Sequence, residues 1–249
     1  MATDVISPFE KDVDEHGGYQ YATNNRRSSI YVYQHFYDVI MRAAQLDGKR
    51  VVDVGCGDGT YTARLRRETK AVSLTGLDPA VKAIERAQRM YEQKPHELSF
   101  ECGFVHDLVA RGLHYDLAIY GGVLHHVADP AAEIADGFRL ADEIFILEPN
   151  GWNPVLKYNE RYSPYHLEHE ERSYRRGQIH HWIEQAGAEI VKSFYFGLVP
   201  VFCPDWMVAI CSRVEPLVER IPLLRMFACG QVGILARRKT QTSYQKIAA

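Results

Sequence analysis

The chain has 249 residues, a length that fits one α/β domain with additions better than two full-sized domains. Its 29 Lys and Arg residues stand against 32 Asp and Glu residues, so the net charge of −3 argues against a protein that binds nucleic acid by neutralising phosphates. A hydrophobic content of 46% with 24% charged residues excludes general disorder.

The first predicted element is a helix in a tyrosine-rich segment near the N-terminus. Ile30, Tyr33, Tyr37 and Ile40 recur at helical spacing within residues 17–45. We expect residues 1–46 to form a helical cap. Two roles stay open for this cap: it forms a lid over a ligand, or it is a helix that packs on the edge of a sheet.

From residue 50 onward, short apolar runs alternate with segments of helical period, which predicts a parallel sheet flanked by helices. A helix is expected over residues 80–91, and Asp129 with Pro130 marks the start of another, as N-cap and first helical residue. The first five strands are predicted at residues 51–54, 72–77, 98–100, 113–120 and 143–147.

The C-terminal part reads as a polar loop, a helix and two further strands. The loop covers residues 148–171, and Gly187 ends the helix that follows it. Strands are predicted at 190–196 and 231–237. The connection between them, residues 198–227, is too long for a hairpin turn, and Pro216 divides its apolar stripe into two predicted short helices.

The first strand runs directly into a glycine-rich turn. Asp53 precedes Gly55, Gly57 and Gly59, and Asp78 ends the second strand about 20 residues later. Glycines let the backbone approach a ligand without a Cβ in the way, and a carboxylate at the second strand can accept both hydroxyls of a ribose. The sequence therefore predicts a nucleoside-binding α/β fold.

The details of this turn argue against a dinucleotide. Its spacing is Gly-x-Gly-x-Gly, and Thr60 stands where a dinucleotide-binding turn has its third glycine. The carboxylate of Asp53 would repel a pyrophosphate but suits a cationic amino group. An NAD-dependent oxidoreductase is therefore disfavoured.

The turn, the Asp78-Pro79 pair and the segment 116–130 with His125 and His126 together resemble the class I S-adenosylmethionine-dependent methyltransferases. The resemblance covers about residues 50–237. It implies an α/β fold with a seven-stranded, mostly parallel Rossmann-like sheet, flanking helices, an N-terminal helical lid and an insertion between the last two strands. The expected domains are the cap at 1–46 and the cofactor-binding domain at 47–249, with the insertion 197–228 forming part of an acceptor pocket.

The resemblance also implies that S-adenosylmethionine is the cofactor and that Asp78 holds its ribose. Relatives often carry Gly-Asp after the third strand, where this chain has Gly103-Phe104, so the adenine amino group is expected to meet backbone atoms or Asp107. The residues expected at the cofactor are Tyr21, Arg26, Asp53, Gly55, Cys56, Gly57, Gly59, Asp78, Pro79, Gly103, Phe104, Tyr120 and Gly121.

His125 and His126 are the candidate general bases, because they follow the fourth strand at the edge where ligands bind in such sheets. The alternative is that both only shape the pocket. The acceptor is expected to contact Asn150, Trp152, Tyr165, His166, Trp206, Met207 and Ile210. No metal site is predicted, since the His166-x-x-His169 pair in a polar loop is typical of solvated side chains.

These observations predict a methyltransferase that acts on a small, partly apolar acceptor, such as a natural-product scaffold or a lipid-like or quinol-like precursor. The alternative is a non-catalytic nucleoside-binding module. The acceptor atom (O, N or C) is left open. For the stripe at Trp206, the alternatives are a lid, a homodimer surface, peripheral membrane contact and core packing.

Five scattered cysteines without a Cys-x-x-Cys pair favour a reducing compartment. The first residues carry Asp4 and Glu10 and no apolar run, so no secretory signal is expected. No apolar run of about 18 residues occurs, which predicts no transmembrane segment. We therefore expect a cytoplasmic protein with a small-molecule partner and no nucleic-acid partner.

Overall fold

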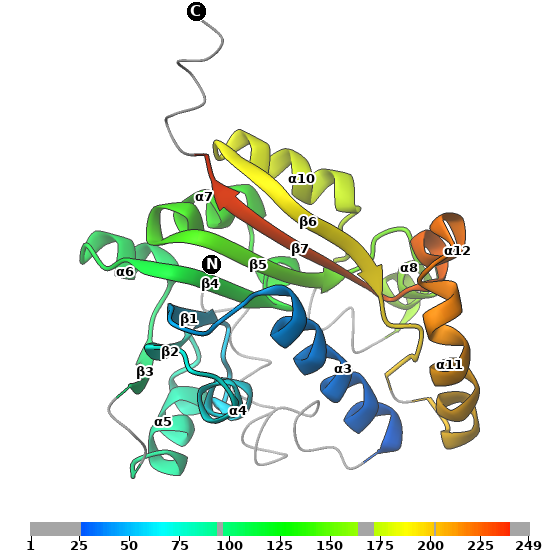
Figure 1. The fold of residues 1–249 in the computed structure, drawn as a ribbon, viewed down its shortest axis with the longest axis horizontal. Helices are drawn as coiled ribbons and strands as arrows, with labels where there is room; N and C mark the ends of the chain where they lie inside the picture. Colours follow the sequence, from blue (N-terminus) through cyan, green and yellow to red (C-terminus); the bar gives the residue numbers. More distant parts are fainter. Residues whose placement is uncertain (1–25, 94–96, 164–171, 202, 240–249) are drawn as a thin grey trace, which may run out of the picture.

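The computed structural model describes residues 26–93, 97–163, 172–201 and 203–239. Within these residues, seven strands form one sheet in the order β3-β2-β1-β4-β5-β7-β6, and β7 runs antiparallel to both of its neighbours (Figure 1). The strands are β1 Arg50–Val54, β2 Ser73–Asp78, β3 Leu98–Cys102, β4 Tyr115–Gly121, β5 Ala141–Pro149, β6 Ala188–Phe196 and β7 Gln231–Arg238. The predicted seven-stranded, mostly parallel Rossmann-like sheet is confirmed.

Helices cover both faces of this sheet, as βαβ connections require. One face carries α3 (Arg27–Ala43), α4 (Thr60–Glu68) and α5 (Val81–Met90). The other carries α6 (Val105–Ala110), α7 (Pro130–Leu140) and α10 (Arg176–Gln185).

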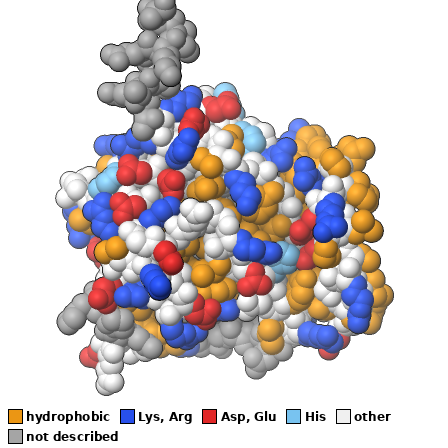
Figure 2. Space-filling view, viewed as in Figure 1, with side chains coloured by type: hydrophobic (Ala, Val, Ile, Leu, Met, Phe, Trp, Pro, Cys, Tyr) orange, Lys and Arg blue, Asp and Glu red, His pale blue; other side chains and the backbone are white. Residues whose placement is uncertain are grey.

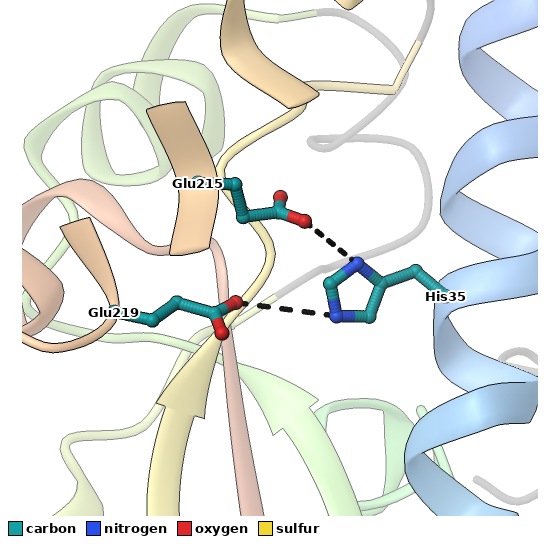
Figure 3. Close-up of side chains that lie close together, drawn as sticks. All are labelled: His35, Glu215 and Glu219. Carbon is teal, nitrogen blue, oxygen red and sulfur yellow. Dashed lines mark ion pairs between the residues drawn. The ribbon is translucent and has the colours of Figure 1, made fainter. Parts of the chain in front are cut away.

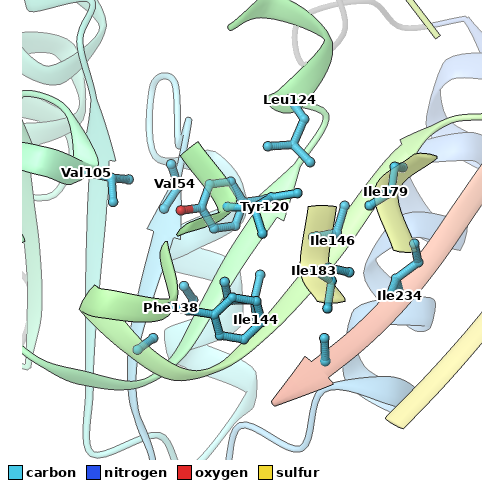
Figure 4. Close-up of a cluster of buried hydrophobic side chains, with 14 of the residues drawn as sticks. Val54, Val105, Tyr120, Leu124, Phe138, Ile144, Ile146, Ile179, Ile183 and Ile234 are labelled. Atoms are coloured by element: carbon cyan, nitrogen blue, oxygen red, sulfur yellow. The ribbon is translucent and has the colours of Figure 1, made fainter. Parts of the chain in front are cut away.

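The larger core lies between the sheet and the helices α7 and α10. Strands β1, β4, β5 and β7 contribute alternate residues to it, because successive side chains of a strand point to opposite faces. Figure 4 shows ten of its side chains labelled: Val54, Val105, Tyr120, Leu124, Phe138, Ile144, Ile146, Ile179, Ile183 and Ile234. This packing fixes the strand ends that carry the site.

The predicted start of α7 is confirmed in detail. The Asp129 carboxylate accepts hydrogen bonds from the backbone N–H groups of Ala131 and Ala132 at 3.1 and 3.0 Å. Pro130 occupies the first helical position, where its missing N–H costs no hydrogen bond. The short 3-10 helix η1 (Leu124–His126) precedes this cap and carries both candidate histidines.

The segment predicted as a polar loop contains a helix, α8 (Pro154–Tyr162). Its start has the same signature as α7: Asn153 caps the backbone N–H groups of Val155 and Leu156, and proline follows at the first helical position. The loop prediction is therefore wrong for these residues, and the Asn-Pro pair was the local signal for the helix.

The insertion forms two helices, as predicted, but the predicted position of the break at Pro216 is wrong. Helix α11 (Asp205–Val218) continues through Pro216, and α12 (Pro222–Ala228) begins one turn later. The proline stands near the end of α11, where the backbone N–H of Glu219 still bonds to the carbonyl of Glu215 at 2.9 Å. Glu215, the residue before the proline, is held by hydrogen bonds from the Tyr31 hydroxyl and the backbone N–H of Leu198.

Across the described part of the chain, no helix combines the length and the hydropathy needed to cross a bilayer.

Candidate functional site

The carboxyl ends of the parallel strands border a cavity of about 1610 Å³. Residues after β1, β2, β3, β4 and β5 line its floor, and residues of α3, α8 and α11 line its walls. In an open α/β sheet, this edge is where ligands bind. The cavity thus joins the predicted nucleoside turn to the N-terminal helix and to the insertion.

The turn that follows β1 requires a residue without a Cβ at two of its positions, Gly55 and Gly59. Gly55 has φ +71°, and a Cβ on it would lie 2.5 Å from Cγ2 of Val123. Gly59 has φ +74°, and a Cβ there would lie 2.4 Å from the ring of Phe100. The backbone is therefore packed against β3 on one side and against the loop after β4 on the other.

Asp78 ties this turn to the end of β2. One carboxylate oxygen accepts the backbone N–H of Gly57 at 2.9 Å, and the other accepts that of Ala80 at 2.9 Å. The side chain is buried yet lines the cavity, and burial raises its pKa despite these two hydrogen bonds. Each oxygen keeps a second lone pair with which it can accept a ligand hydroxyl.

Asp53 is the second carboxylate at this edge. Its Oδ2 accepts the hydroxyl of Thr62 at 2.6 Å, and the side chain lines the cavity while being almost fully buried. Burial, with the charge of Asp78 as a smaller cause, raises the pKa of Asp53 to about 6. A buried carboxylate of this kind gains most from a cationic partner.

His125 forms a buried pair with Glu148. Its Nδ1 lies 2.8 Å from Oε2 of Glu148, while Oε1 accepts the backbone N–H groups of Val123 and Leu124 at 2.8 and 2.7 Å. Because Glu148 is an acceptor in all three contacts, Nδ1 is assigned as the donor, which makes Nε2 the basic nitrogen of the neutral ring. The ring of His126 lies against it, with centroids 3.8 Å apart, and both histidines line the cavity.

A second polar cluster joins the N-terminal helix to the insertion (Figure 3). His35 of α3 places Nδ1 2.9 Å from Oε1 of Glu215 on α11, and its Nε2 faces Glu219 at 4.0 Å. Tyr31 donates its hydroxyl to the same oxygen of Glu215 at 2.8 Å. We call these four residues the clasp, and it closes one wall of the cavity.

The carboxylates of the clasp are also held by the chain after β6. The backbone N–H of Leu198 donates to Glu215 at 2.6 Å, and that of Gly197 donates to Glu219 at 3.0 Å. Burial acts to raise the pKa of Glu215, but the hydrogen bonds from His35 and Leu198 outweigh it and hold that pKa below its ordinary value. The sequence carries no local signal for this cluster, because its members lie far apart in the chain.

The structure brings most of the predicted residues to the cavity. These are Arg26, Asp53, Gly55, Cys56, Gly57, Asp78, Pro79, Gly103, Phe104, Gly121, His125, His126 and Met207. Tyr21, Tyr165 and His166 lie outside the described residues.

Other predicted residues are placed elsewhere. Tyr120 is fully buried in the larger core and does not line the cavity. Gly59 packs against Phe100 and does not line the cavity either. Asp107 caps α6 by accepting the backbone N–H of Phe104 at 2.9 Å, and it does not line the cavity either. Trp152 lies beneath the guanidinium of Arg175, 4.2 Å from the ring centroid.

Two residues of the insertion also depart from the prediction. Trp206 is 66% exposed and Ile210 is 55% exposed, so both face solvent and only their neighbour Met207 lines the cavity. The helical period identifies an apolar stripe, but it does not show which side of the helix faces the protein.

The cavity also holds residues that the sequence did not single out. Glu133 on α7 lines it, and burial together with the nearby Asp136 raises the pKa of Glu133 to about 7. Arg172 and Glu160 line the part next to α8. The positions of Glu133, Arg172 and Glu160 depend on how the helices pack. For Glu133 alone the sequence gave a local indication, because it stands in the first turn of a helix with a recognisable N-cap.

Asn150, predicted at the acceptor, is fully buried and holds α12 in place. Its amide nitrogen donates to the carbonyls of Met226 and Cys229 at 2.9 and 2.8 Å, and its oxygen accepts the backbone N–H of Trp152 at 3.0 Å. Asn150→Ala is therefore expected to lower the free energy of unfolding by about 2–4 kcal/mol, since it leaves buried polar groups unpaired. Urea denaturation measures this loss, and an unchanged stability with altered ligand affinity would contradict the structural role.

Comparison with known proteins matches part of this chain to methyltransferases. Residues 51–141 match a family described as a methyltransferase domain. A ubiquinone biosynthesis O-methyltransferase of Nitrosospira multiformis is 31% identical over 114 residues, which is 45% of this chain and 44% of that protein. A similar enzyme of Chromobacterium violaceum is 31% identical over 117 residues, or 46% of this chain and 47% of that protein. The matched segment thus spans less than half the length of these curated relatives.

Solved structures share the fold over nearly the whole chain. A possible histamine N-methyltransferase from Thermotoga maritima superposes with a TM-score of 0.67 at 14% identity, covering 94% of this chain and 100% of that one. Magnesium protoporphyrin IX methyltransferase from Synechocystis, with bound S-adenosylmethionine, gives 0.60 at 16% identity, with 94% and 97% covered. The cyclase SpnF gives 0.63 at 17% identity, with 95% and 93% covered, so this fold alone does not fix the reaction.

Proposed function

We propose that this chain, which carries a methyltransferase domain of the class I S-adenosylmethionine-dependent type, transfers a methyl group to a small, partly apolar acceptor that presents a hydroxyl group. The observation that carries the proposal is the glycine turn of Gly55 to Gly59, set between the buried carboxylates of Asp53 and Asp78 at the edge of one large cavity.

The residues at this edge fit the cofactor. The two free lone pairs of Asp78 suit ribose hydroxyls, and the buried carboxylate of Asp53 suits the cationic amino group of the methionine part. A Cβ on Gly121 would meet no atom within 4 Å, so the end of β4 leaves space beside the turn. When bound, S-adenosylmethionine supplies a methyl group on a sulfonium that a nucleophile can displace in line.

The histidine pair supplies the base for a hydroxyl acceptor. Val123, which covers Gly55, donates its backbone N–H to Glu148, so the pair is anchored directly beside the glycine turn. Nε2 of His125 can take the acceptor proton while Glu148 stabilises the resulting imidazolium. The chain otherwise contributes by positioning the acceptor and excluding water.

The cavity walls favour an acceptor with an apolar body. Phe36, Ile40, Val199, Met207 and Phe227 line them beside the polar floor. Ubiquinone biosynthesis O-methyltransferases are among the relatives, which supports a phenol or quinol hydroxyl as the accepting group. We further propose that the enzyme acts in the cytoplasm, with no nucleic-acid partner.

The first test of this assignment is the cofactor affinity of Asp78→Ala. Losing hydrogen bonds between a carboxylate and the ribose is expected to weaken S-adenosylhomocysteine binding by about 2 kcal/mol. Calorimetry measures this change. The control is Asp116→Asn, which lies at the start of β4, away from the strand ends that border the cavity, and should bind normally. Unchanged affinity in a folded Asp78→Ala variant would reject the role of Asp78 at the ribose, and tighter binding of NAD than of S-adenosylhomocysteine by the wild type would reject S-adenosylmethionine as the cofactor.

A screen of phenolic and quinol acceptors with labelled S-adenosylmethionine tests the transfer itself. Label in a methyl ether product supports the proposal. Binding of S-adenosylhomocysteine without transfer to any hydroxyl acceptor would instead indicate a non-catalytic nucleoside-binding module.

A further inference from the structure

Helices α11 and α12 turn large apolar side chains toward solvent. Trp206, Leu217 and Leu223 are 66%, 62% and 71% exposed. Figure 2 shows hydrophobic side chains gathered along the edge of the molecule where these helices lie, with Lys and Arg side chains among them. We call this surface the outer face, and its apolar members are Trp206, Ile210, Val214, Leu217, Ile221, Leu223, Leu224 and Phe227.

Helix α11 differs from an ordinary surface helix in that an apolar stripe runs along its exposed side. Trp206, Ile210, Val214 and Leu217 recur at helical spacing on its exposed side. Its inner side buries Val208 and Glu215, and Glu215 is held in the clasp. Because an exposed helix normally turns its apolar stripe inward, a stripe that faces outward over two consecutive helices indicates a binding surface.

The charges on the outer face are almost all positive. Arg213 and Arg220 are exposed, while Glu215 and Glu219 turn inward to His35 and to backbone N–H groups. Among residues 205–228, all of which the structure describes, Asp205 at the start of α11 is the only exposed acid. A chain with a net charge of −3 thus presents a local basic and apolar surface.

We propose that the outer face binds the surface of a lipid bilayer that contains anionic headgroups. Exposed Trp and aliphatic side chains enter the boundary between headgroups and acyl chains, and arginines among them pair with lipid phosphates. Helix α11 has 14 residues and α12 has 7, so both suit an interfacial position and neither can span the hydrocarbon core.

A second copy of the chain fits this face less well. A two-fold dimer would bring the same surface onto itself, and hence Arg213 and Arg220 of each copy against a surface that lacks exposed carboxylates except Asp205. An anionic bilayer neutralises these arginines and covers the apolar side chains at the same time. The proposal does not depend on methyl transfer, because none of the apolar members except Phe227 lines the cavity.

Flotation with vesicles tests the proposal on the full chain. The protein is expected to float with vesicles of equimolar phosphatidylcholine and phosphatidylglycerol. A variant with Leu217→Glu and Leu223→Glu should bind them about tenfold more weakly or worse, since two inserted side chains become charged. The matched control is Met90→Glu with Val191→Glu, which places the same charges on apolar side chains exposed elsewhere and should float like the wild type.

The arginines are tested in the same assay. Arg213→Gln with Arg220→Gln should weaken binding about fivefold for each charge removed. Arg67→Gln with Arg89→Gln removes two exposed charges from α4 and α5 and is expected to have no such effect. Vesicles of phosphatidylcholine alone should bind the wild type more weakly than the mixed vesicles.

Fluorescence gives a readout that does not require the charged variants to fold well. Emission of exposed Trp206 is expected to shift to shorter wavelength with the mixed vesicles, and Trp206→Phe should remove that shift. The proposal is overturned if the wild type does not float, or if the outer-face and control variants bind equally. It is also overturned if sedimentation shows a dimer that Leu217→Glu with Leu223→Glu dissociates while vesicle binding is absent.

Discussion

Replacing His125 with Asn is expected to lower kcat about 10²- to 10⁴-fold, while the affinity for S-adenosylhomocysteine stays unchanged. The reason is that Nε2 of His125 is the base proposed to take the acceptor proton, and Glu148 fixes its orientation from within the protein. Steady-state kinetics with a phenolic acceptor measure the change. His114→Asn, at the opposite end of β4 beside Asp142, is the matched control and should retain wild-type turnover.

Replacement of Glu148, the hydrogen-bond partner of His125, distinguishes a role in catalysis from a role in stability. Glu148→Gln keeps the size of the side chain but lets an amide N–H face Nδ1, which disfavours the required tautomer. Turnover should fall, and the pH at which the activity rises should move, whereas a purely structural residue would change stability alone. Near-normal turnover in both His125→Asn and His126→Asn would make the histidines pocket walls and would favour an acceptor that needs no base.

Asp53→Asn is expected to stabilise the ligand-free protein and to weaken cofactor binding. The pKa of Asp53 is raised from 3.8 to about 6 in the fold, so the unfolded chain loses this proton first as the pH rises. The folded state is therefore penalised by about 3 kcal/mol above pH 6, and the penalty disappears below the unfolded pKa. Asn removes it while keeping an oxygen for the hydroxyl of Thr62.

Urea unfolding of wild type and Asp53→Asn across pH 4 to 8 measures this difference, which should grow as the pH rises toward about 6. Asp116→Asn is the contrasting control, because Arg50 lowers the pKa of Asp116 and its replacement should destabilise. In calorimetry, Asp53→Asn should bind S-adenosylhomocysteine about tenfold to a hundredfold more weakly, since the amino cation loses an opposite charge. A variant that is less stable at every pH and binds normally would contradict this role.

The sequence predicted the parts of the site that depend on neighbouring residues. The glycine turn between Asp53 and Asp78 was visible because a strand, a turn and a second strand each leave a local pattern. The cap at Asp129 was visible for the same reason. The alternation of strands and helices predicted a parallel sheet with flanking helices, but it did not predict the order of the strands.

The remaining features depend on contacts between distant segments. Tyr31 and Glu215 are 184 positions apart, so no window of sequence shows that α3 and α11 meet. Helix α11 also continues through Pro216, against the local preference for a break. Periodicity identified the stripe at Trp206 but not its orientation, and the structure shows that the opposite side of the helix buries Val208 and Glu215.

The position of β7 has a consequence for how the chain folds as it is synthesised. Among the described strands, β7 comes last in sequence, yet it lies between β5 and β6 and pairs with both. Until residues 231–238 leave the ribosome, β6 has no neighbour in the sheet, and β5 exposes one edge. The two strand edges that β7 covers therefore stay unpaired until β7 has been synthesised, and unpaired strand edges favour aggregation during that interval.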